Sequence, residues 1–177
     1  RDLAPGRPAR MAEPRRGWPA GAREAARALG VDGLYAHQAE ALDVVADGEH
    51  TLLATPTASG KTLAYLLGFL ARRAIDPSAR AVFMYPLKAL ARDQLQTIRR
   101  FLAPLGLDGP EAAEVYDGDT PDGERRKIRR RPPAVLVTNP DMLHLGILPA
   151  HETWAPFLER LALVVVDEAH VYRGIFG

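Results

Sequence analysis

Two short segments, far apart in the sequence, contain the residue types from which a nucleotide-hydrolysing site could be built. Residues 55–62 follow a short apolar run and open a helical pattern, which is the strand-loop-helix context that a phosphate-binding loop requires. Residues 164–170 end an apolar strand in two acids, Asp167 and Glu168. An aspartate at such a strand end can hold Mg²⁺ on the phosphates, and a following glutamate can orient or activate the attacking water. Together the two segments predict a site for ATP and Mg²⁺.

The phosphate-binding loop gives its last residues distinct roles. Gly60 lets the backbone approach the phosphates, Lys61 is expected to bridge the β and γ phosphates, and Thr62 is expected to place its hydroxyl on Mg²⁺. The backbone N–H groups of the anion site are expected at Thr57, Ala58, Ser59 and Gly60. Thr55 departs from the general pattern, because a glycine commonly stands there. The strand, the helix and the partner acids still favour a phosphate loop over a chance Gly-Lys-Thr helix start.

Composition limits the classes of function. The chain has 177 residues, 47% of them apolar, which is enough for one α/β domain with a proper core. Its formal net charge of +1 gives no overall sign of a polyanion partner, so nucleic-acid binding must be argued from local motifs. The lack of cysteine excludes a disulfide framework and a thiolate metal site within these residues, and it favours a cytoplasmic location. The longest apolar stretch, about residues 63–71, is too short to cross a bilayer.

Helical and strand patterns alternate along most of the chain. Strands are expected at 51–54, 81–85, 114–116, 134–138 and 161–166, and helices at 22–29, 37–46, 62–75, 88–102, 122–130, 140–148 and 154–160. Such alternation predicts an α/β fold with right-handed crossovers and a mainly parallel sheet covered by helices on both faces. Ligands bind at the carboxyl ends of the strands in that fold, so both chemical segments should line one edge of the sheet.

Residues 1–19 lack either periodicity. They are rich in Pro, Arg, Gly and Ala, and we expect a basic linker or loosely packed extension. Composition leaves an ordered arm and a disordered tail open.

Five segments in a fixed order give the chain a family resemblance. They are YAHQ at 35–38, TPTASGKT at 55–62, YPLKALARDQ at 85–94, TNPDMLH at 138–144 and DEAH at 167–170. With them, the sequence from about residue 34 to residue 177 resembles superfamily 2 helicases of the DEAD/DEAH-box class. The resemblance implies a RecA-like P-loop NTPase domain in which Tyr35 and Gln38 belong to the nucleotide site, with the glutamine amide reading adenine. The alternative for Gln38 is a polar residue that opens a helix.

The third and fourth segments resemble motifs that grip a nucleic-acid backbone. Each places a helix start after a strand, where exposed N–H groups and a hydroxyl suit the phosphates of a single strand. Lys88 and Thr138 are the best side-chain candidates, and the full set is Pro86, Lys88, Ala89, Thr138 and Asn139. Two ordinary strand-to-helix turns are the alternative reading.

Three further features have competing interpretations. His170 closes the DEAH box, and the resemblance implies that it links the nucleotide site to the nucleic acid and to a second motor domain; the alternative is a strand-end histidine with no partner. Asp119 is expected to be a turn residue or a cap. The basic run 125–131 is either a solvated helix face or a phosphate-binding patch.

Residues 55–62, 86–90 and especially 167–177 look like the mitomycin-repair type of bacterial DNA helicase, relatives of the fungal and archaeal RecQ-four-like enzymes. That type implies two RecA-like domains, a zinc-binding C-terminal region and 3′ to 5′ translocation on single-stranded DNA. We therefore expect residues 20–177 to be the first RecA-like domain of a longer protein, truncated after the DEAH box and without the second motor domain and its arginine finger. Alone, such a piece should bind ATP weakly and hydrolyse it very slowly.

The predicted function is that of the ATP-binding motor domain of an ATP-dependent DNA helicase, involved in DNA repair. The expected partners are single-stranded DNA and the second RecA-like domain of the parent chain. Three alternatives remain open. One is an RNA-remodelling ATPase of the same superfamily, since contacts to the strand backbone alone do not distinguish the sugar. The others are a nonhydrolytic nucleotide-binding scaffold and a double-stranded translocase within a nuclease or restriction assembly. The intact Lys61, Thr62, Asp167 and Glu168 argue against the scaffold.

Overall fold

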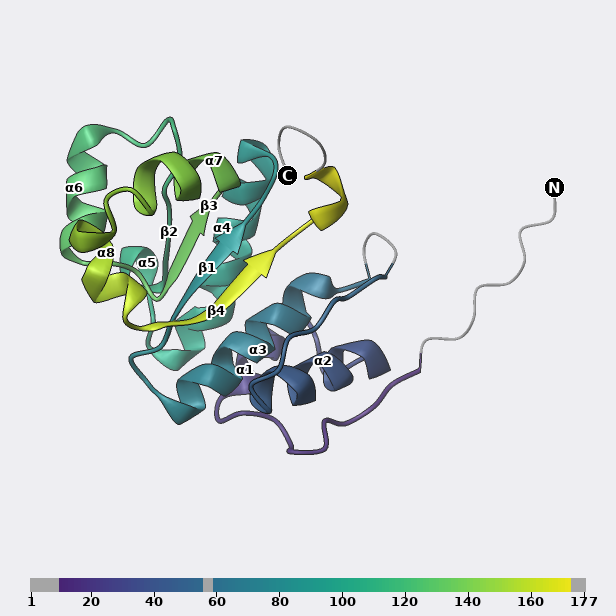
Figure 1. Ribbon diagram of the computed structural model, residues 1–177. Coiled ribbons are helices and arrows are strands. Elements are labelled where there is room, and N and C mark those ends of the chain that lie inside the picture. Colours follow the sequence, from purple (N-terminus) through teal and green to yellow (C-terminus); the bar gives the residue numbers. More distant parts are fainter. Residues whose placement is uncertain (1–9, 56–58, 173–177) are drawn as a thin grey trace.

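The computed structural model describes residues 10–55 and 59–172 (Figure 1). Its centre is a parallel four-stranded sheet with the order β2-β3-β1-β4. The strands are β1 (Arg80–Met84), β2 (Ala113–Val115), β3 (Val135–Thr138) and β4 (Leu161–Val166). In register, Phe83 of β1 lies between Val137 of β3 and Val165 of β4. The prediction of an α/β fold with a mainly parallel sheet is confirmed.

Helices connect and cover the strands. The α-helices are α1 (Ala22–Ala28), α2 (Ala36–Ala46), α3 (Lys61–Ile75), α4 (Lys88–Leu102), α5 (Gly109–Ala112), α6 (Asp122–Arg130), α7 (Pro140–Met142) and α8 (His151–Leu158). Short turns of other helical types are η1 (Ala103–Leu105), η2 (Leu143–Ile147) and η3 (Ala169–Val171), of which η2 is π-helical. None of the described helices has the length and apolar content needed to cross a membrane.

Strand periodicity divides the core into two layers. Ala81, Phe83 and Tyr85 point into a cluster with the apolar faces of α1, α2, α3 and α4. Val82 and Met84 belong to a second cluster, which includes side chains of α6 and α8. Because alternate residues of a strand face opposite sides of the sheet, a strand buried on both faces reads as the continuous apolar run seen in the sequence.

The strand expected at residues 51–54 is not present, and this prediction is wrong. Leu52 is 82% exposed, and no described strand pairs with this segment. A strand needs a neighbouring strand that takes up its backbone hydrogen bonds. Among the described residues β4 is an outer strand of the sheet, and residues 51–54 do not pair with its free edge. An apolar run beside a phosphate loop is therefore not sufficient to form a strand here.

Other differences concern element ends. The single helix expected at 140–148 is split into α7 and the π-helical turn η2, and the helix expected at 154–160 begins earlier, at His151, and ends at Leu158. The short elements η1, α5 and η3 were not expected. The helices at 88–102 and 122–130 and the strand at 161–166 have the expected ends.

Residues 10–19 form an ordered arm on α2. Met11 makes an antiparallel bridge with Tyr35, and the Ala12 N–H donates to the Leu34 carbonyl at 2.9 Å. The buried Asp43 of α2 accepts from the backbone N–H of Arg15 at 2.9 Å and of Arg16 at 3.3 Å. Of the alternatives open for this stretch, the ordered arm holds for its described part, while a domain boundary near residue 20 stays a prediction.

Candidate nucleotide site

Gly60 occupies a position that only glycine fits. It precedes the first residue of α3 with φ +78°, a left-handed conformation that side chains with a Cβ disfavour. A Cβ at this position would stand 2.4 Å from Nε2 of Gln38. The end of the phosphate loop therefore packs against the start of α2. Thr57 and Ala58 lie outside the described residues.

Gln38 ties α2 to the loop with both ends of its amide. Its Oε1 accepts from the Tyr35 N–H at 2.9 Å, which caps the helix, and its Nε2 donates to the Gly60 carbonyl at 2.9 Å. Nε2 of His37 lies 3.0 Å from the Ser59 carbonyl, and the His37 ring stacks on Tyr35. The helix-opening role of Gln38 is thus present in the structure. One N–H and one lone pair of the buried amide remain for a base, so its reading of adenine stays a prediction.

Lys61 connects the phosphate loop to the acidic segment. Its Nζ donates to the Thr55 carbonyl at 3.3 Å and lies 3.6 Å from Oε1 of Glu168. Thr55 Oγ1 and Ser59 Oγ, on either side of the undescribed residues of the loop, lie 2.6 Å apart. The two segments that the sequence analysis singled out are therefore brought together.

Thr62 belongs to a chain of hydroxyl and amide groups beneath the loop. Its Oγ1 donates to Oε1 of Gln94 on α4 at 3.2 Å and accepts from the Tyr65 hydroxyl at 3.2 Å. The Tyr65 and Tyr85 hydroxyls lie 2.9 Å apart. Burial raises the pKa of Tyr65 to about 12 and also raises that of Tyr85, and the charge of Asp167 adds to both shifts. Both phenols are therefore neutral hydrogen-bonding groups.

Asp167 and Glu168 follow β4 at the carboxyl edge of the sheet. The Asp167 N–H continues the sheet pairing by donating to the Met84 carbonyl at 3.0 Å, and its Oδ1 accepts from the Glu168 N–H at 3.0 Å. Burial raises the pKa of Asp167; the neighbouring Glu168 charge adds to this effect, while the Glu168 N–H and the Lys61 charge oppose it. Oε2 of Glu168 lies 3.3 Å from Nδ1 of the exposed His170. Glu168 therefore stands between the ammonium of the loop and the last residue of the DEAH segment.

The donor set suits a hard cation. The Thr62 hydroxyl and the Asp167 carboxylate supply oxygen ligands, which Mg²⁺ prefers. Among the residues that the structure describes, no group of three or more His, Asp or Glu side chains could hold a metal. Phosphates and water would complete the coordination, as is usual for Mg²⁺ in nucleotide sites.

The predicted nucleic-acid contacts differ in accessibility. The Thr138 side chain is buried, and its Oγ1 donates to the Tyr116 carbonyl at 2.7 Å. Because this hydroxyl is already bonded inside the sheet, the predicted contact of the Thr138 hydroxyl with a nucleic acid does not hold in this structure. Oδ1 of Asn139 accepts from the Met142 N–H at 2.8 Å and caps α7. Pro86 is half-buried, whereas Lys88 and Ala89 are exposed. Of the predicted contact residues, Lys88 is the one with a cationic side chain, and that side chain is exposed.

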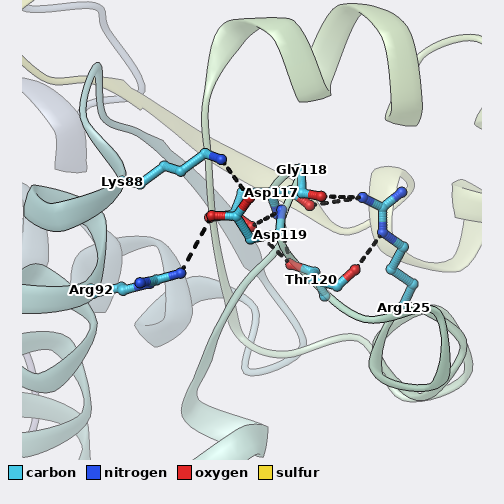
Figure 2. Close-up of polar contacts among 7 residues, drawn as sticks. All are labelled: Lys88, Arg92, Asp117, Gly118, Asp119, Thr120 and Arg125. Carbon is cyan, nitrogen blue, oxygen red and sulfur yellow. Dashed lines mark hydrogen bonds and ion pairs between the residues drawn. The ribbon is translucent and has the colours of Figure 1, made fainter.

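Asp119 lies in the turn after β2, as expected. The internal hydrogen bonds of this turn are made by Asp117 and Thr120, whereas the Asp119 carboxylate points outward to Lys88 at 2.6 Å (Figure 2). Asp119 is therefore not the capping residue of this turn. Sequence reasoning also missed Tyr65, Tyr85 and Gln94. Tyr65 could have been noticed because it lies one helical turn after Thr62. Gln94 reaches Thr62 only through the packing of α4 beside α3, which no local pattern reveals.

The profile of DEAD/DEAH box helicases matches residues 35–177. The chain belongs to the DEAD/DEAH box helicase family. It is 45% identical over 148 residues to an uncharacterized ATP-dependent helicase, YprA, of Bacillus subtilis, covering 84% of this chain and 19% of that protein. It is 41% identical over 146 residues to the ATP-dependent helicase HRQ1 of Saccharomyces cerevisiae, covering 82% of this chain and 14% of that protein.

A solved structure gives the same result for the fold. The DUF1998 helicase MrfA, bound to DNA and AMPPNP, superposes with a TM-score of 0.87 at 40% identity, covering 97% of this chain and 24% of that one. The expected helicase resemblance and RecA-like fold are confirmed. The DEAD/DEAH box domain described here thus spans about a quarter or less of the length of these relatives.

Proposed function

We propose that the chain is the ATP-binding motor domain of an ATP-dependent helicase that moves along single-stranded DNA. The observation that carries this proposal is the 3.6 Å approach of the Lys61 ammonium to the Glu168 carboxylate, which puts a phosphate-binding cation beside an acid able to orient water. The similarity to a helicase bound to DNA and AMPPNP supports the choice of ligands.

Each site residue has a proposed task. Lys61 leaves Glu168 to bind the β and γ phosphates, together with the backbone of the loop, including Thr57, Ala58 and Ser59. Thr62 and Asp167 hold Mg²⁺, which when bound offsets the charge of the phosphates. Glu168 then orients the attacking water and takes up its proton.

Two residues are proposed to connect the site to its surroundings. Gln38 reads adenine with the N–H and lone pair that its backbone contacts leave free, and Tyr35 flanks the base. His170, which is exposed and contacts Glu168, passes the state of the nucleotide to the nucleic acid and to a second motor domain. That domain supplies an arginine, a group worth about 10³ to 10⁵ in rate where it is removed, so this domain alone should be nearly inactive.

The remaining assignments rest on the family resemblance. We propose a role in DNA repair, 3′ to 5′ movement, and a zinc-binding region in the parent protein. The dependence on intracellular ATP and DNA supports a cytoplasmic location. The start of α4, with Pro86, Lys88 and Ala89, and the backbone at Thr138 and Asn139 are the proposed contacts to the strand.

Steady-state ATP hydrolysis by the parent protein tests the function. It should be measured without polymer, with single-stranded DNA and with single-stranded RNA. We expect strong stimulation by DNA, and loss of turnover in Lys61→Ala and Glu168→Gln. Equal or greater stimulation by RNA would assign the parent to RNA remodelling. Turnover unchanged by Glu168→Gln would contradict the role of that residue, and no turnover under any condition would leave a nucleotide-binding scaffold.

A further inference from the structure

Two cations on the first turns of α4 share one carboxylate. Lys88 and Arg92 lie four residues apart, on the same face of the helix. Nζ of Lys88 is 2.6 Å from Oδ1 of Asp119, and Nη2 of Arg92 is 3.6 Å from Oδ2 of the same residue (Figure 2). The side chains of Lys88, Arg92 and Asp119 are 49%, 64% and 53% exposed, so the cluster lies on the surface.

The loop that carries Asp119 is fixed by other residues. Oδ1 of Asp117 accepts from the Asp119 N–H at 2.8 Å, and the Asp117 N–H donates to Thr120 Oγ1 at 2.9 Å. Arg125 of α6 clamps the loop by donating to the carbonyls of Asp117 at 2.9 Å and Thr120 at 2.8 Å (Figure 2). The Asp119 side chain makes none of these bonds. It is therefore presented to α4 by a loop whose shape does not depend on it.

The arrangement around Asp119 matches the binding of a phosphate group. An ammonium and a guanidinium that converge on two oxygens of one anion form the charge-assisted contacts by which proteins hold phosphates. The Lys88 hydrogen bond and charge hold the pKa of Asp119 below its usual range, so the carboxylate is charged at neutral pH. A strand phosphate that approaches the start of α4 must compete with this anion.

We propose that Asp119 is a built-in competitor, which occupies a phosphate position between Lys88 and Arg92 and is displaced when a single strand binds. The inference rests on the proposed contact between α4 and the strand. In this arrangement Asp119 lowers the affinity of α4 for the strand, because fewer cations are free to neutralise its phosphates. A lower affinity suits a motor, which must release the strand repeatedly.

Binding of a fluorescent single-stranded DNA to the full-length parent protein tests the proposal, with affinity measured over a range of salt concentrations. Asp119→Asn keeps the loop hydrogen bonds, which involve only the backbone of this residue. We expect it to raise affinity about two- to fivefold at low salt, the range of an exposed ion pair. We expect the plot of log affinity against log salt to steepen by up to about one, because more phosphates are neutralised.

Asp122→Asn is the matched control, since it removes the same charge from an exposed residue three positions away that has no ion pair among the described residues. It should change affinity much less than Asp119→Asn. In a Lys88→Ala, Arg92→Ala background the gain from Asp119→Asn should disappear, because no cation remains to be freed. Thermal unfolding of each variant checks that the fold is retained.

The outcomes separate the two proposals. If Lys88→Ala with Arg92→Ala leaves DNA affinity unchanged, the contact between α4 and the strand is wrong. If the Lys88→Ala, Arg92→Ala variant binds DNA more weakly but Asp119→Asn leaves affinity unchanged, the contact between α4 and the strand stands. The proposed role of Asp119 as a competitor is then overturned. A fall in affinity with Asp119→Asn would also overturn it, because Asp119 would then be positioning the two cations for DNA.

Discussion

The hydroxyl of Thr62 donates to Oε1 of Gln94 at 3.2 Å and so joins the start of α3 to α4. Lys88 lies at the start of the same α4. The helix α4 therefore carries the proposed DNA contact and also bonds the proposed Mg²⁺ ligand of α3. Because Thr62 gives its proton to Gln94 and accepts from Tyr65, one lone pair of its oxygen remains, in a fixed direction, for a cation.

Gln94→Ala should weaken nucleotide binding only when Mg²⁺ is present. Loss of the hydrogen bond lets the Thr62 hydroxyl rotate, and we expect about a two- to tenfold loss of affinity. Titration of a fluorescent nucleotide with and without Mg²⁺ measures this. Gln96→Ala, an exposed change on the same helix, is the control. An equal loss without Mg²⁺ would show that α4 had moved instead.

Gly60→Ala should destabilise the fold more than Gly30→Ala. Both glycines have positive φ, +78° and +76°, so both variants lose about 1–2 kcal/mol to backbone strain. Only the methyl at position 60 meets a neighbour, Nε2 of Gln38 at 2.4 Å, whereas nothing lies within 4 Å of a Cβ at position 30. Urea unfolding should show a further loss of about 1–3 kcal/mol for Gly60→Ala. Equal losses would mean that Gln38 simply moves aside.

The hydrogen-bonded pair of the partly buried Tyr65 and the buried Tyr85 should respond unequally to removal of their hydroxyls. Tyr65→Phe leaves the Tyr85 hydroxyl with no partner among the described residues, which should cost about 1–3 kcal/mol. Tyr85→Phe leaves the Tyr65 hydroxyl bonded to Thr62, so we expect about 0.5–1.5 kcal/mol. Chemical denaturation of both variants gives the comparison. A larger loss for Tyr85→Phe would contradict the hydrogen-bond chain.

Asp167 should lower stability at neutral pH. Its pKa is raised by burial, so the native state holds the proton more tightly than the unfolded chain, and the free energy of unfolding falls as pH rises through the native pKa. Asp167→Asn should therefore be more stable than the wild type at pH 7. The gain should vanish below the pKa of an unfolded aspartate, about 3.9, where both states are protonated. Denaturation at a series of pH values measures this trend.

Asp119→Asn is a control for the pH series, because the pKa of Asp119 is shifted in the opposite direction to that of Asp167. The pKa of Asp119 is lowered by the Lys88 hydrogen bond, so its contribution to stability is present above the unfolded pKa and is lost as pH falls through the native pKa. The variant should be slightly less stable at pH 7, with the difference shrinking in acid. Parallel trends for the two variants would contradict one of the two assigned shifts.

Local pattern was sufficient for much of the fold. The ends of α4 and α6 follow from helical periodicity, and those of β4 from its unbroken apolar sequence. The segment 51–54 has an equally apolar sequence but forms no strand, since strand formation depends on a partner distant in sequence. The meeting of the segments of Lys61 and Glu168 at one edge was anticipated because both were expected to follow strand ends, although only β4, before Glu168, forms a strand.

The partners of polar side chains could not be predicted in the same way. Gln38 was expected at the nucleotide, and its amide also bonds the backbone of Tyr35 and Gly60, two partners that the sequence did not reveal together. Thr138 was expected to contact a nucleic acid, and its hydroxyl donates to the Tyr116 carbonyl inside the sheet. A polar side chain forms hydrogen bonds with the groups that the folded chain brings within reach. For Gln38 those groups depend on the packing of α2 against the loop, and for Thr138 on the position of β3 beside β2.

Glu168 is the one residue other than glycine with a positive φ, 49°, in the described part of the chain. Its left-handed backbone is held by the Asp167 carboxylate, and an L-residue without a short polar side chain adopts it at a cost of about 1–2 kcal/mol. Directed evolution for heat resistance alone should therefore accept glycine or asparagine at this position. The variants that remain folded at the highest temperature would then lack Glu168, the proposed general base. Any such selection therefore needs a measurement of ATP turnover at every round.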